Sequence, residues 1–189
     1  QNHTQLPPGF LFSYETERLI LRLPSTDYLR EIHDFLYRNR SCFEKYEPTA
    51  PENYYTLDFP ADARQVVIKT LLLKLSSVRF YVFLKEDPST IIGTVCLHNI
   101  IKMPYFTSEV GYKFDASYQH HGYAREALSM ALSVGFYGLG LHKIFARCMP
   151  ENTPSRNLLH ATGFFPRKEL SATVFSFREN GKITSATLS

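Results

Sequence analysis

The hydrophobic pattern changes period near residue 77, and this change constrains the fold more than any other feature of the chain. Residues 78–85, 90–100 and 108–115 are short runs rich in Val, Ile, Phe and Tyr, which predict three successive strands. Residues 123–139 then carry apolar side chains at helical spacing, and residues 143–149 return to a strand pattern. Strands mixed with helices in this order predict a three-layer α/β or α+β domain.

The flanking segments complete this arrangement. Residues 17–24 alternate and predict a first strand that ends at Pro24, and Leu29, Ile32 and Leu36 lie at helical spacing. The other predicted segments are a loose leader over 1–13, an aromatic loop over 46–60, a helix over 61–75, a short helix over 152–163 and a final hairpin with its turn at Asn180–Gly181. We therefore expect the leader to be followed by a single domain over 14–189.

The composition argues against two classes of partner. The 21 basic and 18 acidic residues give a net charge of +3, which is too small to favour nucleic acid. No apolar run approaches the roughly 18 residues that a membrane span needs, so we expect no membrane association. Cys42, Cys96 and Cys148 lie far apart and form no CxxC pair, which indicates reduced thiols and a cytoplasmic protein.

The stretch Tyr118–Ala127, YQHHGYAREA, leads from a predicted strand into a predicted helix. A helix N-terminus presents unpaired N–H groups and a partial positive charge, so it attracts phosphate. Gly122 allows a ligand to approach the backbone, and the small Ala124 keeps the first turn accessible. A tight loop without a ligand is the alternative. His120 and His121 are adjacent and have no third ligand at helical spacing, so we expect them to face a phosphate or solvent rather than a metal.

Two polar motifs are candidate catalytic sites, and each has a purely structural alternative. Glu109 lies two residues before Gly111 on a strand where a bulge is expected, so it is either a positioned base or a solvated edge charge. Asn152 is a good N-cap, which brings Ser155 and Arg156 into the first turn of the short helix. There they are either functional or only part of the cap.

These motifs are spaced in a recognisable order. Taken together, ETERLILR, EVGYKF, QHHGYAREAL, GLHKIFARCMPENTPSRNLL and TGF resemble the GNAT acetyltransferase superfamily, and most closely its RimJ/RimL-like branch of ribosomal-protein-alanine acetyltransferases. The resemblance covers residues 14–167. It is carried by Gln119, Gly122 and Ala124 in the loop and by Asn152 and Ser155 in the short helix.

The resemblance implies the GNAT acyl-CoA N-acyltransferase fold, with helices on both faces of a mixed, mostly antiparallel sheet that splays between the strands near 107–114 and 143–148. It also implies an acetyl-CoA-dependent N-acetyltransferase, in which a primary amine attacks directly within a ternary complex. Glu109 would be the general base, Ser155 would serve the leaving thiolate, and an N–H near Tyr112 would stabilise the oxyanion. No metal is implied, and the residues implied to bind acetyl-CoA are Tyr112, Lys113, Phe114, Gln119, His120, His121, Gly122, Tyr123, Ala124, Arg125, Asn152 and Arg156.

The chain departs from the family pattern in two places. Many members carry a catalytic Tyr seven residues after the Asn, where this chain has Leu159, and the C-terminal segment differs from the branch's aromatic ending. The acceptor amine is therefore left open between a protein N-terminus and a small molecule, bound by the first two helices, the loop over 46–59 and the C-terminal hairpin. A non-catalytic acyl-CoA-binding or regulatory module is the alternative function, and both a monomer and a homodimer are compatible with the sequence.

Overall fold

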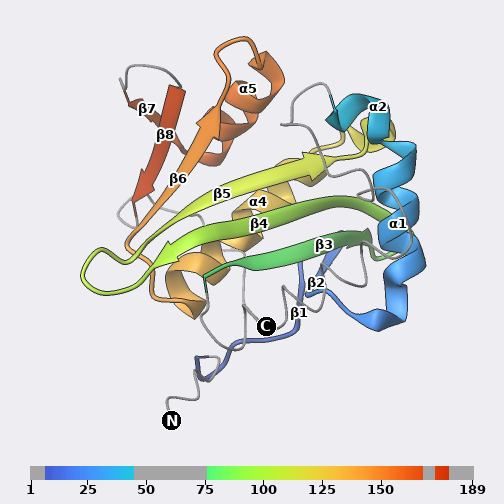
Figure 1. Ribbon diagram of the computed structural model, residues 1–189, viewed down its shortest axis with the longest axis horizontal. Helices are drawn as coiled ribbons and strands as arrows, with labels where there is room; N and C mark the ends of the chain where they lie inside the picture. Colours follow the sequence, from blue (N-terminus) through green and yellow to red (C-terminus); the bar gives the residue numbers. More distant parts are fainter. Residues whose placement is uncertain (1–6, 45–75, 168–172, 179–189) are drawn as a thin grey trace.

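An eight-stranded sheet forms the centre of the computed structural model, which describes residues 7–44, 76–167 and 173–178. The strands lie in the order β1-β2-β3-β4-β5-β6-β8-β7 (Figure 1). Their bounds are β1 Ser13–Glu15, β2 Leu19–Arg22, β3 Val78–Leu84, β4 Ile91–Ile101, β5 Thr107–Phe114, β6 Lys143–Cys148, β7 Phe165–Arg167 and β8 Thr173–Arg178.

The junction between β5 and β6 differs from the rest of the sheet. These two strands are parallel, whereas all the other neighbours are antiparallel. Their pairing begins at Thr107 with Lys143 and ends at Val110 with Ala146, and beyond this point the strands diverge (Figure 1). The predicted splay is therefore confirmed, and it leaves one edge of β5 without a strand partner from Gly111 onward among the described strands.

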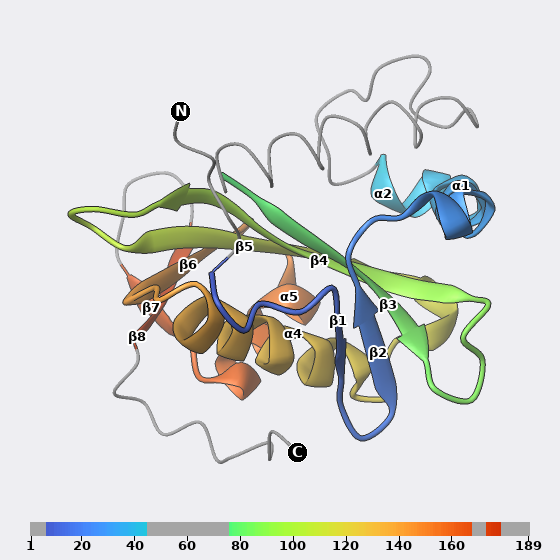
Figure 2. The same cartoon turned by 90° about the horizontal axis from the view of Figure 1, so that it is seen from below.

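Helices cover both faces of the sheet, as predicted (Figure 2). On one face lie α4 (Tyr123–Ser133), which continues into a π-helical turn, and α5 (Thr153–Thr162). On the other face lie α1 (Leu29–Arg38) and the short α2 (Arg40–Phe43). The apolar stripe of α4 explains its position, because Ala127, Leu128, Ala131 and Leu132 are all at most 1% exposed.

Two hydrophobic clusters result from this layering. The larger one lies between α4, α5 and the sheet, and it includes Phe80, Leu97 and Leu159. The smaller one packs α1 and α2 against the opposite face through Phe35 and Phe83. Burying each of these large side chains contributes roughly 1.5–3 kcal/mol, so the end of the sheet beside α1 is held firmly on both faces.

The N-terminal segment differs from the predicted loose leader. Strand β1 begins at Ser13, and the ring of Phe10 is 8% exposed and contacts that of Tyr14 edge-on at 6.0 Å. The prediction of a loose segment over 1–13 is therefore wrong for residues 7–13, because Phe10 belongs to the larger cluster. Residues 1–6 lie outside the described part of the chain.

The C-terminal strand lies between two others. Strand β8 pairs antiparallel with both β6 and β7, so its two edges are occupied around Phe175. The predicted hairpin turn at Asn180–Gly181 lies outside the described residues. The predicted loop over 46–60 and helix over 61–75 lie outside the described residues, as does the segment 179–189.

Candidate functional site

The loop that precedes α4 has the backbone of an anion site. Gly122 is the N-cap of α4 with a φ of 81°, and His120 also has a positive φ, of 64°. The first helical bond runs from the N–H of Glu126 to the carbonyl of Gly122 at 3.1 Å, so the N–H groups of Tyr123–Arg125 precede it. A glycine N-cap provides no side chain to occupy these donors. The loop therefore presents N–H groups and the positive end of the helix dipole to an anion.

A clamp that the sequence analysis missed holds this loop. The carboxylate of Glu126 accepts hydrogen bonds from the Arg18 backbone N–H and Nε, both at 2.8 Å, and from the Thr16 hydroxyl at 2.6 Å. Arg18 also donates to the His121 carbonyl at 3.0 Å, and its Cζ lies 4.6 Å from the centre of the Tyr123 ring. The sequence contains a sign of this clamp. Arg18 lies in the ETERLILR motif, and Glu126 is an acidic residue in the first turn of the helix.

The electrostatics of the clamp follow from these bonds. Burial opposes ionisation of Glu126, but the hydrogen bonds from Thr16 and Arg18 together outweigh it and hold the pKa of Glu126 below its ordinary value. Glu126 is therefore a carboxylate at neutral pH, which suits its place near the positive end of the α4 dipole.

One of the two adjacent histidines, His121, makes contacts within the loop. The Nδ1 of His121 lies 2.7 Å from the Gln119 carbonyl, and its ring stacks on Tyr123 with centres 5.6 Å apart. His120 is exposed. Within residues 7–44, 76–167 and 173–178, no three His, Cys, Asp or Glu side chains gather as a metal would require.

Glu109 lies where β5 and β6 begin to diverge, opposite His98 on β4 and Phe145 on β6. Its carboxylate accepts two hydrogen bonds from Arg147, from Nε at 2.9 Å and from a terminal nitrogen at 3.1 Å, and lies 3.7 Å from His98 Nε2. The hydrogen bond from Arg147 lowers the pKa of Glu109 below its ordinary value, with burial of the carboxyl working in the opposite direction. Glu109 is therefore ionised at neutral pH, as a base must be, but it is a weaker base than a free carboxylate.

The bulge expected at Gly111 is on the neighbouring strand instead. The pairing of β4 with β5 is regular from Gly93 opposite Phe114 to His98 opposite Glu109. The register shifts only between His98 and Ile101, where Asn99 has a φ of 51°. Gly111 therefore interrupts the side-chain face of the sheet without interrupting its hydrogen bonds.

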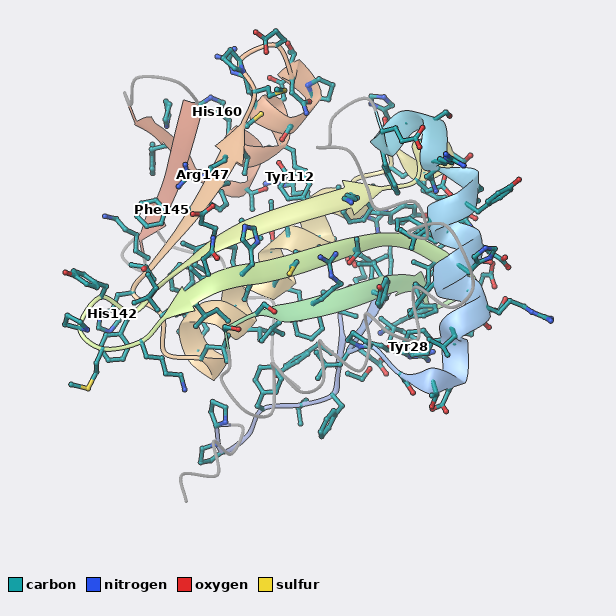
Figure 3. The ribbon with its side chains drawn as sticks, in the orientation of Figure 1. Tyr28, Tyr112, His142, Phe145, Arg147 and His160 are labelled. Carbon is teal, nitrogen blue, oxygen red and sulfur yellow. The ribbon has the colours of Figure 1, made fainter. Side chains whose placement is uncertain are left out.

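On the other face of β5, Tyr112 reaches across to α5 (Figure 3). Its hydroxyl lies 2.7 Å from Ser155 Oγ and donates to the Ser155 carbonyl at 3.3 Å. Burial raises the pKa of Tyr112 to about 12, although the hydrogen bond with Ser155 works against this shift. The sequence predicted a role for the backbone of Tyr112 but not for its hydroxyl. Leu159 is fully buried.

The remaining predicted residues divide between the two faces. Asn152 caps α5 by accepting a hydrogen bond from the Ser155 N–H at 3.2 Å. Arg156 donates to the Pro150 carbonyl at 3.1 Å, and its Nε is buried without a hydrogen-bond partner among the described residues. The Phe114 ring is buried in the core. Because side chains alternate along a strand, Lys113 lies on the same face as Glu109, and its Nζ is 5.2 Å from the centre of the Phe43 ring. The structure thus does not bring the Lys113 side chain to the loop before α4.

Comparisons with known proteins agree with this geometry. Residues 18–165 match the model of the Acetyltransferase (GNAT) domain. The chain is 32% identical over 126 residues to the probable N-acetyltransferase YjcK of Bacillus subtilis (strain 168), an alignment that covers 67% of this chain and 68% of that protein.

Solved structures show the same architecture. Ribosomal-protein-S5-alanine acetyltransferase from Vibrio fischeri is 26% identical, with a TM-score of 0.80 over 89% of this chain and 97% of that one. Mycobacterium smegmatis RimJ in complex with CoA-disulfide has a TM-score of 0.86 over 96% and 94% of the two chains, and at 18% identity it shows the fold alone. None of the helices in the described residues has the length and apolar character to cross a bilayer. The match over residues 18–165 and the similarity to YjcK show that the chain belongs to the GNAT acetyltransferase family and is an N-acetyltransferase.

Proposed function

We propose that the protein transfers the acetyl group of acetyl-CoA to a primary amine by direct attack in a ternary complex, with a protein N-terminus or a small amine as acceptor. The observation that carries this proposal is the divergence of β5 and β6 beside the loop before α4. Glu109 lies on one face at this point, and the hydroxyls of Tyr112 and Ser155 lie on the other. The CoA bound to Mycobacterium smegmatis RimJ supports the choice of cosubstrate.

The residues around the divergence fit acetyl-CoA. The N–H groups of Tyr123–Arg125 suit the pyrophosphate, because the N-cap leaves them without a side-chain partner. Among the described strands, β5 has no partner on this edge beyond Val110, and its backbone groups there suit hydrogen bonds with the amide-bearing pantetheine arm. The buried Nε of Arg156 is a further donor without a partner in the described protein, and a bound acceptor atom there would remove the cost of its burial.

The chemistry requires one proton to leave the amine and one to reach the thiolate. The amine nitrogen bonds to the acetyl carbon and gives a tetrahedral intermediate, whose oxyanion the N–H near Tyr112 stabilises. The intermediate then collapses as the carbon–sulfur bond breaks and the thiolate leaves. Glu109 accepts the amine proton, directly or through water, and its low pKa favours passing that proton on to solvent. Ser155, held by Tyr112, hydrogen-bonds the leaving thiolate, which takes its proton from this pair or from solvent.

Thiol release with a panel of amines and N-terminal peptides tests the proposal. Glu109→Gln keeps the shape of the side chain, so we expect an unchanged affinity for acetyl-CoA and a turnover lower by about 10²-fold, the usual contribution of a positioned base. The loss should be greatest at low pH, where more of the amine is protonated. Glu15→Gln is the control, because Glu15 is an exposed carboxylate that pairs with Lys85 at 3.1 Å rather than with Arg147.

Two results would contradict the proposal in different ways. Equal rates for Glu109→Gln and the wild type across the pH range would remove Glu109 as the base. Tight binding of acetyl-CoA without turnover on any acceptor would instead favour the non-catalytic acyl-CoA-binding module.

A further inference from the structure

Arg147 is the first residue of β6 beyond its pairing with β5. The last backbone pair joins Val110 to Ala146, and Glu109 lies opposite Phe145 one position earlier. Because side chains alternate along a strand, Phe145, Arg147 and Glu109 share one face of the sheet. Figure 3 labels Arg147 at this position on β6. The side chain of Arg147 thus reaches from the diverging strand back to the carboxylate on β5, at the point where the backbone pairing ends.

Arg147 binds both oxygens of the Glu109 carboxylate. Its Nε donates to one oxygen at 2.9 Å, and a terminal nitrogen donates to the other at 3.1 Å. Two such bonds between planar groups fix the plane of the carboxylate as well as its position, which the compact ammonium of a lysine does not do. A guanidinium has more N–H donors than these two, so Arg147 can hold Glu109 and contact another group at the same time.

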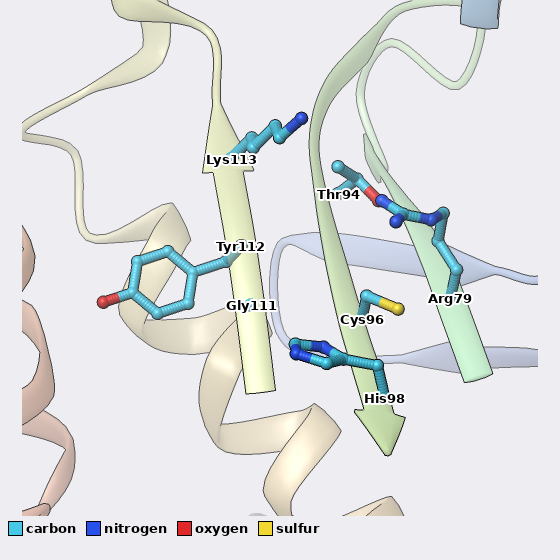
Figure 4. Close-up of a pocket in the computed structure, with 7 residues that line it drawn as sticks. All are labelled: Arg79, Thr94, Cys96, His98, Gly111, Tyr112 and Lys113. Atoms are coloured by element: carbon cyan, nitrogen blue, oxygen red, sulfur yellow. The ribbon is translucent and has the colours of Figure 1, made fainter. Parts of the chain in front are cut away.

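A pocket of about 240 Å³ lies on the same face, on the side of Glu109 away from β6 (Figure 4). Side chains from β3, β4 and β5 line it, and they form the polar face around Gly111. Gly111 has no side chain to fill this space, and His98 extends toward it from β4, with its Nε2 3.7 Å from the Glu109 carboxylate. Arg147 and the pocket therefore flank Glu109 on opposite sides, so an amine can approach the carboxylate without displacing Arg147.

We propose that Arg147 is a positioning residue for acetyl transfer, which holds the Glu109 carboxylate so that it faces an acceptor amine arriving across the polar face around Gly111. Arg147 acts through Glu109 rather than on the substrate. This inference rests on the proposed transfer reaction, in which Glu109 is the base.

The same contact has an electrostatic consequence that opposes catalysis. The hydrogen bond from Arg147 is the largest cause of the lowered pKa of Glu109, and burial of the carboxyl works against it. The charge of Arg147 and the side chains of His98 and Asn99 lower the pKa further. Removing Arg147 would therefore make Glu109 a stronger base but leave it free to rotate. A positioning role predicts that the loss of orientation outweighs the gain in basicity.

Two variants of Arg147 separate orientation from charge. Arg147→Lys keeps the cation without the planar fork, and Arg147→Met loses both. With the best acceptor of the amine and peptide panel, we expect each to lower kcat about tenfold, because a carboxylate that rotates freely loses its alignment with the amine. The Kd for acetyl-CoA should not change. Lys85→Met is the control, because it also removes the cation of a carboxylate pair, with Glu15 at 3.1 Å, and should leave kcat unchanged.

Combining variants tests whether Arg147 acts through Glu109. In the Glu109→Gln background, Arg147→Met should change kcat by less than about twofold, because the effects of residues that act together do not add. An equal loss of kcat in both backgrounds would overturn the inference and leave the transfer reaction intact. A kcat in Arg147→Lys that equals or exceeds that of the wild type would also overturn it.

A titration measures the contact without turnover. The carboxyl carbon of Glu109, followed by ¹³C NMR and identified by its loss in Glu109→Gln, should show a pKa that rises toward the ordinary value in Arg147→Met and rises less in Arg147→Lys. An unchanged pKa in Arg147→Met would show that the two side chains do not pair in solution and would overturn the inference. Absence of turnover in the wild type would overturn the transfer reaction itself, and with it the role of Arg147, even where the titration shows the pair.

Discussion

The loop before α4 and the polar face around Gly111 belong to one proposed reaction but are built in different ways. The loop is a run of consecutive residues, and its donors are the backbone N–H groups at the start of one helix. The polar face gathers side chains from β3, β4, β5 and β6, which come together only because these strands are neighbours. In the proposed reaction, binding of the acetyl donor would thus depend on local backbone geometry, whereas the placement of the side chains around Glu109 depends on the order of strands in the sheet.

The clamp between Arg18 and Glu126 limits this contrast. These residues lie 108 positions apart, yet their hydrogen bonds determine how the start of α4 lies against the start of β2. The loop is thus local in its donors but not in its orientation. Variants that change the local donors and the distant support separately test this distinction.

Replacing Gly122 by valine changes the backbone of the loop before α4. A β-branched residue at a φ of 81° is strained by roughly 1–3 kcal/mol, and relief of the strain would move the N–H groups of the first helical turn. We expect the Kd for acetyl-CoA, measured by calorimetry, to rise at least about tenfold. Gly140→Val is the matched control, because Gly140 has a φ of 69° with open space around it. It should lower Tm without changing the Kd, and an equal Kd in both variants would show that loop conformation does not determine the affinity.

Replacing Glu126 by glutamine weakens the clamp that supports the loop and should have an intermediate effect on acetyl-CoA affinity. The change removes the charge that holds Arg18 and Thr16, so we expect the Kd for acetyl-CoA to rise about threefold and stability to fall by about 1 kcal/mol, a value kept small because Arg18 is 43% exposed. Glu44→Gln, which breaks an exposed pair with Arg40, is the control and should leave the Kd unchanged. An unaltered Kd in Glu126→Gln would mean that the loop needs no distant support.

The same variant predicts a pH dependence of stability. The folded pKa of Glu126 lies below its unfolded value, so the carboxylate stabilises the fold fully above the unfolded value of about 4.3. This contribution is lost as the pH falls through the lowered folded pKa. Thermal melts should therefore separate the wild type from Glu126→Gln at pH 7 and bring the two together below the ordinary range of a glutamate.

Removing the hydroxyl pair should have the smallest effect on acetyl-CoA affinity, because the pair acts on turnover. Ser155→Ala and Tyr112→Phe each delete one oxygen of the 2.7 Å contact, and we expect each to lower kcat by about two- to tenfold with an unchanged Kd for acetyl-CoA. If the hydroxyls act as a pair, the double variant should be about as slow as the slower single variant. Effects that multiply would show that they act separately, and full activity of Ser155→Ala would leave Ser155 as part of the helix cap only.

The features that the sequence by itself determined are those that depend on near neighbours in the chain. The strands around 78–114, the helix that follows Gly122 and the cap at Asn152 were predicted because side-chain period, backbone freedom and capping act within a few residues. Glu109 was identified as a candidate base from its place on the strand, although its bond to Arg147 was not.

Only the tertiary structure decided the contacts that cross between elements. Arg18 meets Glu126, Arg147 meets Glu109, and Tyr112 meets Ser155 because of strand order and helix placement. The pairing of β7 with β8 was not predicted, for the same reason. Local period states whether a residue lies on a strand and which face it shares with its neighbours, but it does not state which strand pairs with which. That choice is made by burial of the whole core, which also brings together the side chains around Glu109 from neighbouring strands.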